Sequence, residues 1–266
     1  MAPPATLLIT GAIDISAFQV PYTRLTDTKV RLQQYIDSLE YAIDNYHRIH
    51  QIVFCENTGY RYDYSELLKK AEQKGKELEI ISFSGNYQTI QVKGKGYGEG
   101  EIVEYALKNS RTLQNCVFFY KLTGRIMVRN MDQLMDRSPS DNTFIFFSDL
   151  KGRFEKGKVR TLFYKVNTSF YKQNLIDAYM EADDNRHHYL EHVFYDRLAK
   201  IPLPSFGKFP DFAGIQASTG KLYQTKLKLI KYRLYHRLHF YSNMEKTLFQ
   251  KMILQIIKTI RFAVPG

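Results

Sequence analysis

The sequence lacks tryptophan, has two cysteines, and contains no long apolar run. A helix that spans a bilayer needs about 18 or more apolar residues in succession, so we expect no such helix. The first residues, Met1 to Pro4, carry neither a basic segment nor a long apolar one, which predicts no signal peptide. Cys55 and Cys116 lie within apolar runs and are expected to be small buried side chains, not a disulfide framework. These absences favour a reducing, cytoplasmic compartment.

Positive charge is concentrated at one end of the chain. The net charge is +11, and residues 221–266 contribute +9 of it, since they hold a single acid, Glu245. The first 220 residues are therefore close to neutral, at +2. A nucleic-acid enzyme usually carries its positive charge around its working groove. We therefore expect no nucleic-acid partner.

The apolar pattern of the first half predicts alternating strands and helices. Strands are expected at 6–13, 51–55, 78–83 and 116–120, with helices at 30–46, 64–74 and 99–109. This alternation indicates parallel βαβ units, in which a ligand lies beyond the carboxyl ends of the strands.

The second half has a different pattern. We expect strands at 144–147 and 161–166, a mostly helical stretch at 172–197, an irregular loop at 201–220 and a basic helical stretch at 225–262. The pattern changes from Asn142 onward, and the basic stretch begins at Lys221.

Four alternate glycines, from Gly94 to Gly100, predict a loop directly before a helix. Backbone amides in such a loop, and at the helix start, favour an anionic ligand. The spacing matches neither the dinucleotide fingerprint nor the P-loop. The alternative is a flexible surface loop.

The stretch 93–129 resembles the middle of a GT-A glycosyltransferase domain. In that family a glycine-containing loop leads into a helix ending in Asn, here Asn109, and a strand then runs into an Asp-x-Asp motif. The G-x-G-E-G-E run of residues 96–101 and the K-x-T-G-R run of residues 121–125 also resemble bacterial glycosyltransferases of capsule and O-antigen (lipopolysaccharide) synthesis. The resemblance covers residues 6–130 and extends weakly to residues 214–223.

This resemblance implies an α/β fold with a GT-A-like, Rossmann-type, mostly parallel sheet flanked by helices. Residues 1–135 would bind the nucleotide sugar, 136–220 would complete the domain with the acceptor and catalytic half, and 221–266 would form a basic amphipathic tail. The expected activity moves a sugar from a nucleotide donor (UDP first, CMP second) to a hydroxyl of a growing, lipid-linked glycan. The donor-binding residues would be Thr10, Gly11, Ala12, Glu56, Lys95, Gly96, Tyr97, Gly98, Lys121, Thr123, Gly124 and Arg125.

The chain departs from the family at the Asp-x-Asp position. Paired carboxylates there would hold Mg²⁺ or Mn²⁺, but Lys121 and Arg125 are cations and cannot ligate a metal. They would instead neutralise the diphosphate, which Arg grips bidentately. We therefore predict no cofactor and a metal-independent reaction, although the sequence does not exclude Mn²⁺ or Mg²⁺. The alternative is a solvated pair at a strand end.

A transferase needs a base for the acceptor hydroxyl. The candidates are Glu191 and Asp149, with His188 nearby, because a helix through residue 191 would put Glu191 on one face with His187 and His188. The alternative is that Asp183 and Asp184 cap a helix and the histidines are structural. The H-x-x-E-H match of residues 188–192 to a zinc protease lacks a convincing further ligand.

The tail mixes apolar residues with cations at helical spacing. This composition suits a helix at the anionic inner face of the plasma membrane, which makes the protein peripheral and brings it to lipid-linked acceptors. The expected membrane contacts are Lys226, Lys228, Lys231, Arg233 and Arg237. The alternative for the tail is a helix packed on the domain with a solvated basic face. The alternatives for the whole protein are a nucleotidyltransferase of similar fold and a non-catalytic module that binds nucleic acid or membrane.

Overall fold

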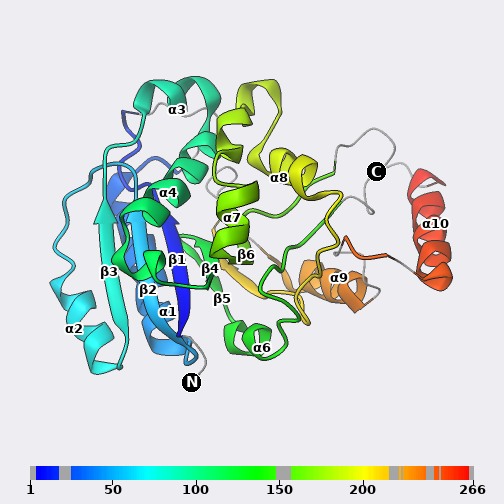
Figure 1. Cartoon of the computed structure of the whole chain (residues 1–266), viewed down its shortest axis with the longest axis horizontal. Helices are drawn as coiled ribbons and strands as arrows, with labels where there is room; N and C mark the ends of the chain where they lie inside the picture. The colour runs from blue at the N-terminus through cyan, green and yellow to red at the C-terminus, as the bar shows by residue number, and fades with distance from the viewer. Residues whose placement is uncertain are drawn as a thin grey trace.

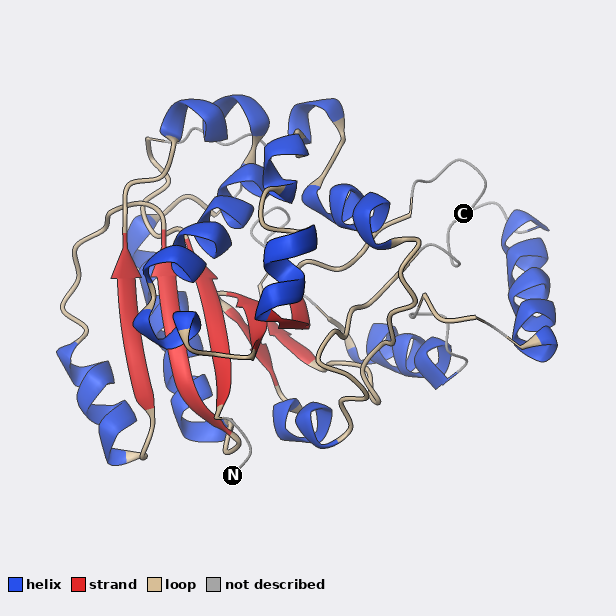
Figure 2. Cartoon of the chain, viewed as in Figure 1, coloured by secondary structure: helices blue, strands red, loops and turns tan. Residues whose placement is uncertain are grey.

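A five-stranded sheet forms the centre of the molecule (Figures 1 and 2). The computed structural model describes residues 4–17, 25–147, 157–215, 222, 224–237, 243–245 and 247–263. The strands, in the spatial order β3-β2-β1-β4-β6, are β3 (Glu77–Ser82), β2 (Ile49–Glu56), β1 (Ala5–Gly11), β4 (Phe118–Thr123) and β6 (Phe163–Asn167). The first four are parallel, and β6 runs antiparallel to β4. The predicted α/β class with a mostly parallel sheet is confirmed.

Helices cover both faces of the sheet. One face carries α1 (Thr28–Asn45) and α2 (Ser65–Gln73), and the other carries α4 (Lys95–Asn109), α7 (Thr168–Asn174) and α8 (Leu190–Leu198). Successive side chains of a strand point to opposite faces, so Leu7 and Ile9 pack under α1 whereas Leu8 packs under α4. Because both faces are covered, β1 is buried along its whole length and shows no polar–apolar alternation.

Shorter elements complete the two ends of the sheet. The helix α3 (Tyr87–Lys93) and the 3₁₀ turns η2 (Ala178–Glu181) and η3 (Asp184–Arg186) lie near the carboxyl ends of the strands, and α5 (Arg111–Gln114) lies near the amino ends. A separate ribbon pairs β5 (Ile126–Val128) with β7 (Phe212–Gly214), and α6 (Met131–Asp136) follows β5. The turns η2 and η3 lie within the predicted helical stretch 172–197, whereas the sequence analysis anticipated none of the other short elements, since each is too short to show a period.

Three predicted elements of the second half differ from the structure. The helical stretch 172–197 is broken, because His187 adopts a left-handed backbone (φ 56°) and α8 begins only at Leu190. Residues 144–147 make an isolated bridge from Phe146 to Val159 where a strand was predicted. The basic stretch divides into α9 (Lys226–Arg237) and α10 (Leu248–Ala263). No helix in the described ranges is long and apolar enough to cross a bilayer.

The predicted glycine loop is wrong, because residues 95–100 form the first turns of α4. Gly94 lies between α3 and α4 with φ 94°, a conformation that glycine adopts readily. The helical glycines allow close packing: a Cβ on Gly98 would lie 3.3 Å from the Asn57 side chain, and one on Gly100 would overlap Tyr179. These glycines therefore serve packing within the fold, and their helix replaces the predicted flexible loop.

Candidate active site

The order of the strands creates a switch point between β1 and β4. From β1 the chain moves outward through β2 and β3, and it then crosses back to place β4 on the other side of β1. Ligands of open parallel sheets bind at such a point, beyond the carboxyl ends of the two strands. The residues that follow β1 and β4, Ala12 and Gly124–Arg125, therefore mark the candidate site.

Arg31 of α1 is buried beneath this point. Its Nε donates to the carbonyls of Ala12 and Ile13, both at 3.1 Å, and its Nη1 donates to the Leu25 carbonyl at 3.0 Å. Burial lowers the pKa of Arg31, and the positive charge of Arg125 lowers it further. Arginine remains charged even so. This residue was missed by the sequence analysis, although its spacing of four residues from Tyr35 puts it on the inward face of the helix.

Arg125 stands beside Arg31, in the turn after β4. Its backbone is left-handed (φ 65°), its guanidinium lies 5.5 Å from the centre of the Tyr35 ring, and its Nη1 donates to Gln34 Oε1 at 3.2 Å. Its Nε is buried and has no hydrogen-bond partner. A buried N–H group without a partner costs free energy, and a bound anion would remove that cost. The structure thus places Arg125 at the predicted edge of the sheet.

The other predicted residues at the end of β1 are largely enclosed. Thr10 and Gly11 are buried, and a Cβ on Gly11 would meet the Phe54 ring. The Ala12 amide donates to the Tyr35 hydroxyl at 2.9 Å. The contact of Thr10, Gly11 and Ala12 with the donor stays a prediction.

Glu56 does not have the predicted role of a free acid at the end of β2. Its side chain is fully buried and accepts hydrogen bonds from the backbone amides of Thr58 (2.8 Å) and Tyr60 (3.0 Å) and from the hydroxyls of Thr58 and Ser82. Its oxygens are thus occupied by the loop that follows β2. This carboxylate shapes the loop, and its predicted contact with the donor is wrong in this geometry.

Lys121 also differs from the prediction. It lies within β4, only 1% exposed, and points toward α4, where its Nζ forms an ion pair with Glu99. The same Nζ donates to Thr123 Oγ1 at 2.8 Å and to the Thr161 carbonyl at 2.9 Å. An ammonium has three donors, so this one is satisfied within the protein. Lys121 is therefore neither the predicted diphosphate contact nor a solvated strand-end residue.

Thr123 and Gly124 fill internal positions at the end of β4. The Thr123 hydroxyl donates to Glu99, and the Gly124 amide donates to the Thr10 carbonyl at 2.8 Å. A Cβ on Gly124 would collide with Tyr35. These two residues thus lie between Glu99, which Thr123 contacts, and Arg125, which follows Gly124 in the chain.

The amino end of α4 is already occupied by a carboxylate. Asp184 of η3 is buried there, and its Oδ2 accepts from the Gly96 amide at 3.3 Å. Burial raises the pKa of Asp184, and the charge of Lys95 opposes that rise. The predicted anion site of the donor at Gly96 is therefore filled by the protein's own acid, and Gly98 lies against Asn57 and Ile90 instead. Asp184 acts as a cap, as the alternative interpretation proposed, but for α4 and not for its own helix.

Lys95 and Tyr97 remain candidates for ligand contact. Lys95 is exposed at the first position of α4, and Tyr97 is half-buried. The Tyr97 ring packs edge-on against Tyr179, with 4.9 Å between centroids, and the Lys93 ammonium lies 5.7 Å from its centre. Their contact with a donor stays a prediction.

Glu191 lies in the first turn of α8 and faces the same group of charges. Burial raises its pKa, as do the nearby negative charges of Glu99 and Asp184, whereas Lys158 lowers it. The predicted helical face with His187 and His188 is wrong, since both histidines precede the helix. The His188 ring stacks on His192 instead, with 6.1 Å between centroids. The other candidate base, Asp149, lies outside the described residues.

The positions of the histidines also bear on the zinc-protease pattern. His188 and His192 do not lie one turn apart on one helix, as that motif requires, because α8 begins at Leu190. Within the described ranges, no group of three His, Cys, Asp or Glu side chains is arranged to hold a metal ion.

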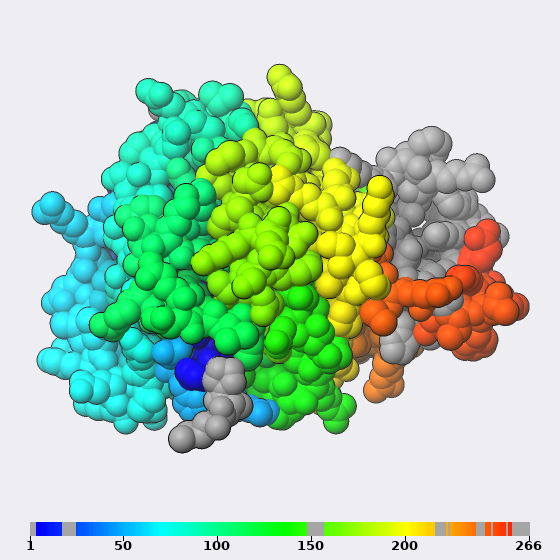
Figure 3. All heavy atoms as spheres, viewed as in Figure 1, coloured from blue at the N-terminus to red at the C-terminus, as the bar shows by residue number. Residues whose placement is uncertain are grey.

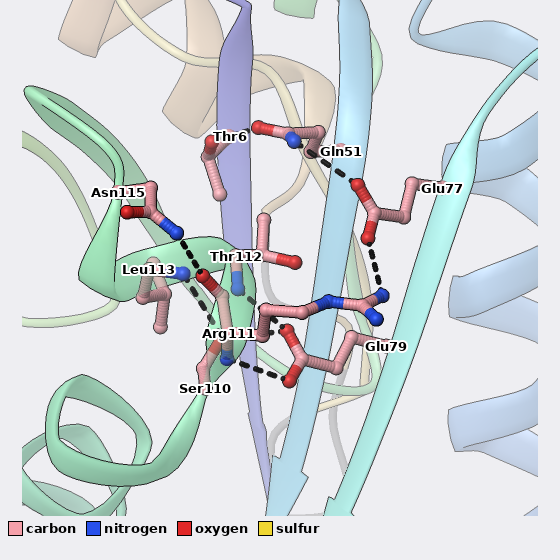
Figure 4. Close-up of polar contacts among 9 residues, drawn as sticks. All are labelled: Thr6, Gln51, Glu77, Glu79, Ser110, Arg111, Thr112, Leu113 and Asn115. Atoms are coloured by element: carbon pink, nitrogen blue, oxygen red, sulfur yellow. Dashed lines mark hydrogen bonds and ion pairs between the residues drawn. The ribbon is translucent and has the colours of Figure 1, made fainter.

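A second polar region lies at the opposite edge of the sheet (Figure 4). A hollow of about 310 Å³ there is lined by Pro4, Gln51, Glu77, Arg111, Thr112, Asn115 and Cys116. The charged side chains there already have partners within the protein. Arg111 forms an ion pair with Glu77 at 2.9 Å, and Glu79 accepts a hydrogen bond from Ser110 Oγ at 2.7 Å. These contacts attach α5 to the sheet, at the end remote from the switch point.

The chain is similar in overall fold to several solved structures. One is the mannosyltransferase Ktr4p of S. cerevisiae in complex with GDP (10% identity, all of this chain and 83% of that chain covered, TM-score 0.48). Others are a putative glucose-1-phosphate thymidylyltransferase of Bacillus anthracis (11%, 88% and 95%, TM-score 0.44) and core-mannan synthase A of Aspergillus fumigatus (10%, 91% and 86%, TM-score 0.44). No protein-family model and no curated protein sequence matches the chain.

The buried ion pair predicts a large and specific loss of stability. Lys121→Met should lower the free energy of unfolding by roughly 3–5 kcal/mol, because Glu99 would lose its partner. The loss should be smaller when Glu99→Gln is added, since no unpaired charge then remains. Urea denaturation followed by circular dichroism measures both.

Lys108 provides the control, because its side chain is 64% exposed while it pairs with Glu104 at 2.6 Å on α4; Glu104 keeps a second partner, the Tyr179 hydroxyl. Lys108→Met should cost less than about 1 kcal/mol. If Lys121→Met costs no more than this control, Lys121 is not the buried partner of Glu99.

Proposed function

We propose that this protein is a glycosyltransferase that uses a nucleotide-sugar donor. The observation that carries the proposal is the pair of arginines at the switch point, with the Arg125 Nε buried and unpartnered. A guanidinium matches the oxygens of a phosphate, and the carboxyl edge of a parallel sheet is where nucleotides bind. Arg31 is held by backbone carbonyls, so Arg125 is the residue that would contact the diphosphate.

In the proposed reaction the acceptor hydroxyl attacks the anomeric carbon of the donor sugar. The bond between that carbon and the diphosphate oxygen breaks, and the nucleotide leaves with the bonding electrons. The Glu191 carboxylate accepts the hydroxyl proton, and Arg125 stabilises the negative charge of the departing diphosphate. Burial and two neighbouring carboxylates raise the pKa of Glu191, which suits a base that must hold a proton transiently.

For the donor, the metal requirement and the acceptor, we keep the hypotheses drawn from the sequence. We propose a UDP sugar as donor, with a CMP sugar as the second choice, and a metal-independent reaction. The acceptor would be a lipid-linked surface glycan, of the capsule or O-antigen kind, met at the cytoplasmic face of a bacterial membrane. A nucleotidyltransferase of similar fold is the main rival, and it would require a metal held by carboxylates.

A panel of nucleotides tests the proposal directly. UDP, CMP, GDP, TDP and ATP are each added with EDTA or with Mn²⁺, and the melting temperature is recorded. One pyrimidine nucleotide should raise it in EDTA, since a ligand that binds only the folded state stabilises that state. Stabilisation that needs Mn²⁺ would contradict the metal-independent mechanism, and no response to any nucleotide would contradict the transferase itself.

The nucleotide found in that panel should depend on Arg125. Arg125→Gln should weaken its binding by roughly 10- to 100-fold, because a charge-assisted hydrogen bond is lost. Arg111→Gln, which removes the same charge at the opposite edge of the sheet, should leave affinity unchanged. Calorimetric titration measures both variants, and equal affinities would remove Arg125 from the site.

Activity should also fall on the acidic side of its pH profile. Glu191 accepts a proton only when ionised, and its pKa is raised, so kcat/KM should decline at a higher pH than an ordinary glutamate would cause. Asp184→Asn removes a negative charge that raises this pKa, so the acidic limb should move to lower pH. Asp183→Asn is the control, and it should leave the limb in place. A profile that is the same in all three proteins would show that Glu191 is not the base.

A further inference from the structure

Helix α9 has two apolar faces that point in opposite directions. Leu229 and Tyr232 pack inward, where the Tyr232 ring lies 5.1 Å from the Phe209 ring. Leu227, Ile230 and Leu234 recur at intervals of three and four residues and therefore lie on one side of the helix. At 100° per residue that side is roughly opposite the inward face. One face thus attaches the helix to the domain, and the other is open.

The open face of α9 is strongly exposed, and α10 carries a similar one. Leu227, Ile230 and Leu234 are 80%, 63% and 56% exposed. On α10, the exposed side chains are those of Leu248, Phe249, Met252 and Ile256. Figure 3 shows these two helices, in orange and red, at one end of the molecule. Elsewhere in the described residues, exposed large apolar side chains include Ile215 and Leu222, which form an isolated bridge with each other; single exposed apolar residues are ordinary for a protein surface.

Positive charges flank the open face of α9. Lys226 and Arg237 lie on one flank, and Lys228 and Lys231 lie on the other, while neither helix contains an acid. Arg233 is the exception among the predicted membrane contacts, since its guanidinium lies 3.6 Å from the Asp211 carboxylate. The open face is therefore an apolar stripe between two rows of cations.

This combination selects among the partners that a basic surface could bind. Nucleic acid would match the cations but would leave the apolar stripe without a partner. A second copy of the chain would match the stripe but would bring its own excess of positive charge against these cations. An anionic lipid surface matches both, since acyl chains receive the stripe and the head groups pair with the cations.

We infer that the outer faces of α9 and α10 form a surface that inserts into the interface of an anionic bilayer. The contact is apolar as well as electrostatic, and it uses Leu227, Ile230 and Leu234 in addition to the lysines. Because the inward face of α9 is packed on the domain, the helix is held to the domain while its outer face meets the lipid. The inference does not depend on sugar transfer, and it is tested without nucleotide.

The test is co-sedimentation of the full-length protein with vesicles of phosphatidylglycerol and phosphatidylcholine, compared with pure phosphatidylcholine. The wild-type protein should bind the anionic vesicles. The triple variant Leu227→Ser, Ile230→Ser, Leu234→Ser should bind them at least about tenfold more weakly, because each residue loses buried apolar area. Circular dichroism and melting temperature confirm that the variant is folded.

A matched variant replaces three exposed apolar residues elsewhere, Leu68→Ser, Val92→Ser and Met180→Ser. It should bind the anionic vesicles as the wild type does. Equal binding by the α9 variant, or equal wild-type binding to neutral vesicles, would overturn the inference. So would a wild-type dimer that the α9 variant converts to a monomer, or tighter binding to duplex DNA than to the anionic vesicles.

Discussion

The ammonium of Lys121 is a buried charge in the middle of a sheet, and the site is organised around its neutralisation. Burial lowers the pKa of Lys121, and the charge of Glu99 opposes that effect. This ion pair connects the first turns of α4 to β4 and so helps to fix the position of the helix. The helical glycines of α4 leave room for other neighbours, with Asn57 beside Gly98 and Tyr179 beside Gly100, and Asp184 caps the amino end of α4. Because Glu99 and Asp184 are both held at this end of α4, their carboxylates lie near Glu191.

The side of the site next to β1 depends on Arg31, whose guanidinium is hydrogen-bonded to backbone carbonyls. Arg31 binds the carbonyls on both sides of the segment between β1 and α1, and so shapes the edge next to the switch point. A guanidinium committed in this way cannot also grip a ligand with the same N–H groups. It still contributes its charge, however, and Arg125 lies close enough to affect its pKa. The two arginines thus differ in task, one structural and one open to an anion.

The apolar pattern was sufficient to predict the parallel strands and the helices α1 and α2, because burial on one or both faces leaves a period in the sequence. The pattern gave a wrong prediction at residues 94–100, because the sequence does not distinguish glycines that allow close helix packing from glycines that form a loop. It also failed for Lys121 and Glu56, whose polar side chains were expected at a ligand. Their partners, Glu99 and the loop after β2, become visible only when distant segments are brought together. Arg125 was predicted correctly in position because a strand end is a local property.

The chemical meaning of the missing Asp-x-Asp motif changes accordingly. Lys121 does not substitute for a metal ion, because its charge is neutralised by Glu99 within the protein. A metal-independent donor site would therefore rely on Arg125, and the nearby positive charge of Arg31 would add to the attraction of an anion. Arginine is suited to this task, since it stays ionised when it is buried and presents two parallel donors to a phosphate. The lysines on the outer flanks of α9 are hydrated point charges, which suit a diffuse anionic surface better than a shaped ligand. The two kinds of cation would thus suit the two proposed anions, a diphosphate at the sheet edge and a lipid surface at α9.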